Sequence, residues 1–61
     1  MDKQKFIQKA TACRVIADDL LADTYNLEDK NIRWESIWRA ERMLDEIDAL
    51  LNYLQSTENE Q

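Results

Sequence analysis

One cysteine and a row of acids are the residues of this chain whose types could support chemistry. Cys13 is the only thiol, and the chain has no His that could act as its base, so the partner that activates a cysteine nucleophile is missing. Cys13 lies at helical spacing between Ala10 and Ala17, where a free Cys behaves as a small hydrophobe. We therefore expect a buried, structural thiol and no catalytic residue.

Three acids recur at spacings of four and three residues: Glu41, Asp45 and Asp48. Carboxylates on one side of a helix could hold a hard cation or act as an acid–base pair. Carboxylate metal sites in helical bundles also use His from a Glu-x-x-His pair, and this chain has no His. We expect a solvated acidic face paired with Lys5, Lys9 and Arg14, with no metal and no cofactor.

Two amphipathic helices must position these residues. Apolar residues recur at alternating spacings of three and four in both halves of the chain: Phe6, Ala10, Cys13, Ala17 and Leu20, and then Ile37, Ala40, Leu44, Ile47, Leu51 and Leu54. This spacing is typical of helices that pack lengthwise, and the chain has no Gly or Pro to interrupt them. We predict an all-α hairpin domain over residues 1–55, with helices at about 3–24 and 28–55, and a disordered tail over 56–61.

The connection between the helices is short and polar. Asn is the residue after Gly that most readily adopts a left-handed conformation, and the connection offers Asn26. The second helix starts at Leu27 if Asn26 caps it, and later if Asp29 or Asn31 does. A connection of this length makes the helices antiparallel, and Asp2 is placed to cap the first helix.

The charges of the two helices are arranged in opposite order. The first helix is basic early and acidic late, whereas the second carries most of its cations in its first half. Folding the chain back therefore brings opposite signs together, although each exposed pair contributes only about 0–1 kcal/mol. We expect ion pairs of Lys5 and Lys9 with Glu46 and Asp48, and of Asp19 and Asp23 with Arg33 and Arg39.

The length of the chain predicts self-association. A chain of 61 residues buries only about 60% of the surface that its unfolded form exposes, and folds of this size usually need disulfides, a metal or oligomerisation. One Cys and no His leave oligomerisation. We predict a homodimer, an antiparallel four-helix bundle whose core is formed by the two apolar series named above.

The formal charge of -5 disfavours nucleic acid as the general partner, because neutralising phosphates requires a basic surface. No apolar run is long enough for a signal peptide or a membrane span, and a single Cys suits a reducing compartment. We expect a cytoplasmic protein that does not bind a membrane. The alternative of a nucleic-acid regulator would use the basic start of the first helix: Lys3, Lys5, Lys9 and Arg14.

Trp34 and Trp38 lie one helical turn apart beside two arginines. They either cover the core of the dimer or anchor another protein, since Trp and Arg dominate binding hot spots. The candidate partner-binding residues are Trp34, Trp38, Arg39, Arg42 and Tyr53. We expect a non-enzymatic regulator or adaptor that binds an unidentified protein, of the kind found among phage, plasmid and bacterial accessory factors.

Two resemblances to known families accompany this interpretation. In its length, the Phe6 to Leu20 series and its central turn, the chain resembles the Rop class of plasmid copy-number regulators, and this implies a dimer of hairpins. RNA binding in that class depends on a basic, amide-rich face, whereas this chain is acidic. The segment from Glu46 to Asn52 is similar to the end of the signature of small sporulation-phosphatase hairpins of bacilli. Just before this segment, the present chain has Leu44-Asp45 where the signature has Ser-Gln. The resemblance implies a second alternative function, a small phosphatase-like hairpin in which Asp48 has a role.

Overall fold

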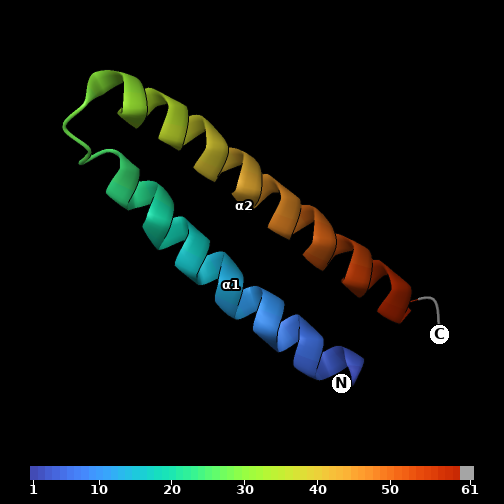
Figure 1. Cartoon of the computed structure of the whole chain (residues 1–61). Coiled ribbons are helices and arrows are strands. Elements are labelled where there is room, and N and C mark those ends of the chain that lie inside the picture. Colours follow the sequence, from blue (N-terminus) through green and yellow to red (C-terminus); the bar gives the residue numbers. More distant parts are fainter. Residues whose placement is uncertain (60–61) are drawn as a thin grey trace.

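The chain folds as two long helices joined by a short connection. The computed structural model describes residues 1–59, and within them the helices are α1 (Lys3–Thr24) and α2 (Lys30–Asn59). They lie side by side as an antiparallel hairpin, in a rod of 49 × 16 × 14 Å (Figure 1). The predicted all-helical hairpin is confirmed.

α1 begins with a side-chain cap and ends with tightened backbone bonds. The Asp2 Oδ1 atom accepts the N–H of Lys5 at 2.8 Å, the predicted N-cap bond. At the other end, the N–H groups of Tyr25, Asn26 and Leu27 donate to the carbonyls three residues earlier, at 3.3, 3.0 and 3.2 Å. These bonds occupy the last carbonyls of the helix, so no left-handed residue is needed. Among residues 1–59 no φ angle is positive.

α2 begins later than the predicted residue 28, because Asp29 supplies the cap. Its Oδ1 atom accepts the N–H groups of Asn31 at 2.9 Å and Ile32 at 3.0 Å. The Nη1 atom of Arg33 donates to the carbonyl of Leu27 at 2.9 Å. Two groups of the connection therefore hold the first turn of α2: the carboxylate of Asp29 and the carbonyl of Leu27.

α2 ends later than predicted. It continues to Asn59, and the hydroxyl of Thr57 donates to the carbonyl of Leu54 at 2.9 Å within the last turns. The predicted disordered tail is therefore wrong over residues 56–59, while residues 60–61 lie outside the described part of the chain. The segment is polar, but it contains no Gly or Pro that would stop a helix.

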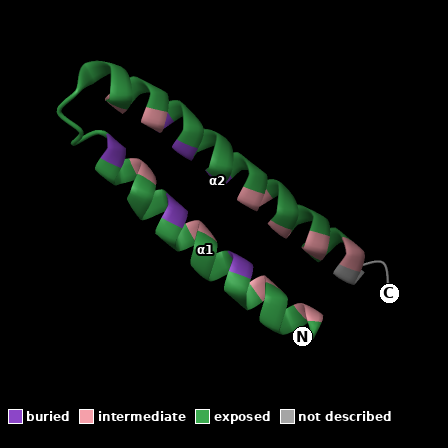
Figure 2. Ribbon diagram, in the orientation of Figure 1, coloured by how far each residue is buried: buried purple, intermediate pink, exposed green. Residues whose placement is uncertain are grey.

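The hairpin seam is the surface along which α1 and α2 pack. α1 contributes Ala10 and Ala17, and α2 contributes Ile37, Ala40 and Leu44, each at most 8% exposed. Figure 2 shows the buried and half-buried parts of the two ribbons facing each other. Small side chains let the helices approach closely, and larger ones fill the remaining space. Within residues 1–59 no large side chain is completely buried, so the core of the single chain is thin.

One ion pair crosses the hairpin seam. The Arg14 Nε atom donates to Asp48 Oδ1 at 2.9 Å, and this confirms the predicted pairing of Arg14 with the acidic face of the second helix. α1 is rotated so that Arg14 faces α2, whereas Lys5 and Lys9 are exposed. The other predicted cross-helix pairs do not form within residues 1–59, and those predictions are wrong: Lys5 and Lys9 with Glu46 and Asp48, and Asp19 and Asp23 with Arg33 and Arg39.

Candidate functional site

An apolar groove lies beside the hairpin seam, between one flank of α1 and one flank of α2. It has a volume of about 550 Å³ and is lined by Phe6, Lys9, Ala10, Cys13, Ile16, Ala17, Leu20, Met43, Ile47 and Leu50. On the α1 wall Phe6 is 40% exposed, Leu20 50% and Ile16 67%. A contiguous run of exposed apolar side chains of this kind is typical of interaction surfaces.

The residues predicted as a dimer core divide between the hairpin seam and the apolar groove. Phe6, Cys13 and Leu20 line the groove and are exposed. The seam of the single chain contains the others, of which the first five are buried and the last three half-buried: Ala10, Ala17, Ile37, Ala40, Leu44, Ile47, Leu51 and Leu54. The single chain therefore covers only part of the predicted core, and the dimer core stays a prediction.

Three residues of the apolar groove are absent from the predicted site residues: Ile16, Met43 and Leu50. The sequence carries a signal for each of them. Each is apolar and lies three or four residues from a member of the predicted series, on its flank. This spacing predicts that they widen the two apolar stripes.

Cys13 is exposed in the single chain, so the predicted burial of its thiol depends on the dimer core and stays a prediction. Because Arg14 bonds to Asp48 across the seam, the neighbouring Cys13 is turned to the side. It lies on the wall of the apolar groove near the middle of α1. Its side chain is thus available to whatever covers the groove.

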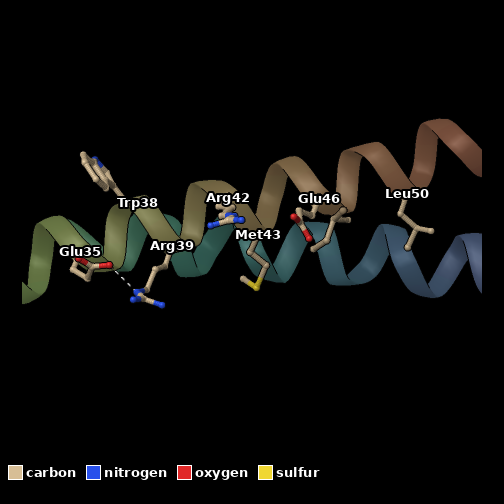
Figure 3. A pocket seen from close by; sticks show the side chains of 8 residues that line it. Glu35, Trp38, Arg39, Arg42, Met43, Glu46 and Leu50 are labelled. Atoms are coloured by element: carbon tan, nitrogen blue, oxygen red, sulfur yellow. Dashed lines mark hydrogen bonds and ion pairs between the residues drawn. The ribbon is translucent and has the colours of Figure 1, made fainter.

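The tryptophan surface is an exposed face of α2 formed by Trp34, Glu35, Trp38, Arg39 and Arg42. Trp34 is 53% exposed and Trp38 71%, and Figure 3 shows the Trp38 indole pointing away from α1. The Arg39 Nε atom donates to Glu35 Oε2 at 2.8 Å, one turn earlier on the helix. In the single chain neither indole covers the hairpin core, so the surface offers large apolar area beside charged groups.

An open hollow connects the tryptophan surface with the apolar groove. It has a volume of about 940 Å³ and runs along α2 from Trp38 to Leu50 (Figure 3). Met43, Ile47 and Leu50 line both the hollow and the groove. Glu46 also lines the hollow, although the sequence did not single it out as a site residue. One side of α2 thus presents a continuous surface that changes from charged and aromatic to aliphatic.

Tyr53 does not join the tryptophan surface. Its side chain is 64% exposed, but it follows Trp38 by fifteen residues, which is about 22 Å along a helix. The structure therefore brings four of the predicted partner-binding residues together on one part of α2 and places Tyr53 elsewhere.

The basic start of α1 does not present its four cations on one exposed face. Lys5 and Lys9 are exposed, whereas Lys3 is half-buried and Arg14 bonds to Asp48. The hydrogen bond and the charge of Asp48 raise the pKa of Arg14, so the guanidinium stays charged at every physiological pH. The residues predicted for the nucleic-acid alternative are thus divided between two exposed lysines and two partly covered cations.

The row of acids on α2 is divided as well. Asp48 is half-buried and accepts the bond from Arg14, whereas Glu41 and Asp45 are exposed and form no ion pair within residues 1–59. In that part of the chain no three His, Cys, Asp or Glu side chains converge on a possible cation site. Asp48 is the residue that the sporulation-phosphatase resemblance singles out, and in this structure its carboxylate is the ion-pair partner of Arg14 across the seam.

The chain was compared with protein-family models, with curated proteins and with solved structures. None of the three comparisons found a significant match. In the described part of the chain, neither helix has the length of apolar sequence that a membrane crossing requires. The basis for a functional proposal is therefore the apolar groove and the tryptophan surface.

Proposed function

We propose that this chain is a small non-enzymatic regulator or adaptor that acts by binding another protein. In this proposal two hairpins pair as an antiparallel four-helix bundle in the cytoplasm, and the faces of the helices that remain outside bind a cellular protein. Such a role fits the accessory factors of phages, plasmids and bacteria. The fit is one of size and build rather than of any motif.

The observation that carries the proposal is the exposure of Trp34 and Trp38. Exposed indoles are costly to leave in water, and two of them one turn apart are usually covered by something. Arg39 and Arg42 lie on the same part of α2, and Trp and Arg are the residues most enriched in binding hot spots. The tryptophan surface therefore has the composition of a protein-binding site.

The thin core of the hairpin supports the homodimer. The seam buries mainly alanines on its α1 side, while Phe6, Ile16 and Leu20 remain substantially exposed in the groove. Covering the groove with a second hairpin would remove this apolar area from water, at about 25 cal/mol per Å². Because Trp38 points away from α1, a dimer formed through the groove leaves its indole available for another partner.

The test is affinity purification with a matched set of variants. Tagged wild-type chain and the Trp34→Ala/Trp38→Ala variant are used to capture proteins from the native host. Val15→Ala is the control, because Val15 is 58% exposed and lies on neither surface. We expect one host protein to be retained by the wild type and by Val15→Ala and to be lost from the double variant, whose helical circular dichroism is unchanged.

Two results would contradict the assignment. If the double variant retains the same protein as the wild type, the tryptophan surface is not the binding site. If the double variant loses its helical signal, the indoles belong to a core, and the partner-binding assignment of Trp34 and Trp38 is wrong.

A further inference from the structure

Five exposed charges on α1 form no ion pair within residues 1–59. One of them, Asp18, lies one turn from Arg14 and acts on its charge. The other four lie on another side of the helix: Lys5, Lys9, Asp19 and Asp23. Their spacings of 4, 10 and 4 residues place them within about a quarter of the helix circumference. Lys9 lines the apolar groove, so this strip of charge follows the α1 edge of the groove. The two basic residues come first and the two acidic residues last.

This order is antisymmetric about the middle of the helix. Lys5 and Asp23 are equally far from residue 14, and so are Lys9 and Asp19. The apolar wall has nearly the same centre, since Phe6 and Leu20 are each seven residues from Cys13. A helix with this pattern, laid antiparallel on a copy of itself, meets opposite charge at every charged position of the strip.

The α2 wall of the groove has a matching centre. The Arg14–Asp48 bond places the middle of α1 beside the segment from Met43 to Leu50, whose aliphatic side chains form that wall. One two-fold axis can therefore pass through the centre of both walls. That is the requirement of an isologous interface, in which the same surface is used on both copies.

We infer that the occupant of the apolar groove is a second copy of this chain in one particular orientation. α1 lies antiparallel to α1 of the partner subunit, and the two connections lie at opposite ends of the bundle. Lys5 then faces Asp23 of the partner subunit, and Lys9 faces Asp19 of the partner subunit. This arrangement rests on the homodimer of the proposed function and specifies its geometry.

The surface area of the hairpin agrees with a second copy as the occupant. The chain exposes 5035 Å², whereas a compact protein of its mass, 7.3 kDa, exposes about 4,200 Å². The excess is close to the roughly 800 Å² that each partner buries in a standard interface. In the opposite placement, with α1 against α2 of the partner, Asp19 and Asp23 would lie near arginines, but Lys9 would lie near Tyr53, in a segment (49–57) that contains no acid. Only the placement of α1 against α1 therefore gives all four charges an opposite partner.

The decisive experiment is a charge-swap complementation. The acidic variant carries Lys5→Glu and Lys9→Glu, and the basic variant carries Asp19→Lys and Asp23→Lys. Each change suits the helix dipole, which favours acids near the start of α1 and cations near its end, so α1 itself is not weakened. The control is Glu41→Lys/Asp45→Lys, which alters net charge as the basic variant does but at exposed positions of α2 that do not line the groove.

We expect each swapped variant alone to dimerise at least about tenfold more weakly than the wild type in sedimentation equilibrium, because like charges then face each other. An equimolar mixture should form a heterodimer of wild-type affinity, seen by native mass spectrometry, because every position again meets opposite charge. The control should dimerise at least as well as the wild type. If only the net charge controlled dimerisation, the basic variant would dimerise more tightly than the wild type, because its net charge is nearer to zero.

A second measurement uses the position of Cys13. The inferred axis brings the two Cys13 thiols together, so 1,2-bis(maleimido)ethane should link them at a rate independent of protein concentration. The control places the thiol outside the groove, in a Cys13→Ser/Val15→Cys variant. Its linkage should be slow and should depend on concentration.

The outcomes separate this inference from the proposed function. A dimeric wild type whose swapped variants are not rescued by mixing, or whose Cys13 thiols do not link, overturns the orientation and leaves the homodimer. If the wild type is still monomeric in sedimentation equilibrium at 100-fold the protein concentration of the capture experiment, both the orientation and the homodimer are wrong. Protein binding through Trp34 and Trp38 is tested by the capture experiment and is independent of either result.

Discussion

The hairpin seam and the apolar groove use some of the same residues, yet one is closed and the other open. Ala10 and Ala17 are buried against α2 and also line the groove. The seam adds the Arg14–Asp48 ion pair, whereas the groove adds the bulky Phe6, Ile16 and Leu20. The face of α1 that closes within the chain is therefore the one with small residues and a polar partner, and the face richer in large apolar groups is left outside.

Weakening the seam should have the largest effect, because the seam holds the two helices of the single chain together. Leu44 is 8% exposed in the seam, and truncating a buried Leu costs about 2–5 kcal/mol. We expect Leu44→Ala to lose most of the stability of a domain this small, measured by urea unfolding followed by circular dichroism at fixed protein concentration. A loss below about 1 kcal/mol would mean that Leu44 does not belong to the packed core.

Substitution in the groove should act on assembly and leave the hairpin intact. Ile16 is 67% exposed in the single chain, so Ile16→Ser should change hairpin stability at high dilution by less than about 0.5 kcal/mol. In a dimer that covers the groove, the same change removes about 1.5–3 kcal/mol of apolar burial per side chain. The melting temperature of the wild type should therefore rise with concentration and that of Ile16→Ser much less. Equal concentration dependence in the two proteins would place the interface elsewhere.

The rotation of α1 is what the sequence could not supply. Two series at spacings of three and four run through its alanines, one through Phe6 and Cys13 and the other through Ile7 and Arg14. The first has the larger apolar groups and was predicted to pack, but the half-buried Ile7 and Arg14 lie toward α2. Periodicity identifies a helix and its possible faces. Which face of α1 packs depends on the helix it packs against. Here Asp48 of α2 bonds to Arg14, and the face that carries Arg14 is the one that packs.

Other features of the fold and site follow from local chemistry, and the sequence predicted those well. The bounds of α1, its Asp2 cap and the antiparallel arrangement agree with the structure.

The start of α2 was left open among three capping residues, because Asn26, Asp29 and Asn31 are all good N-caps. The grouping of Trp34 and Trp38 was predicted from their spacing, but their exposure was not, because it depends on which stripe of α2 faces α1.

The cap of α2 offers a smaller test, because it sets which residues of α2 reach the seam. Asp29 accepts two backbone N–H groups, and replacing such a cap by Ala costs about 1 kcal/mol. We expect Asp29→Ala to lose about this much in urea unfolding. Asp2→Ala should lose less, because the first turn of a terminal helix frays easily. If Asp2→Ala were the more damaging change, the connection would not be what fixes the register of the hairpin.

The smallest expected effect concerns Trp38, which belongs to neither the seam nor the groove. Its side chain is 71% exposed and points away from α1, so Trp38→Ala should change the free energy of unfolding by less than about 0.5 kcal/mol. Acrylamide should quench the fluorescence of a Trp34→Phe variant, whose only indole is that of Trp38, equally well at low and high protein concentration, because a dimer formed through the groove leaves this side chain uncovered. Quenching that falls as the protein is concentrated would show that self-association covers the tryptophan surface. The inferred orientation would then be wrong, because the interface would include the outer face of α2.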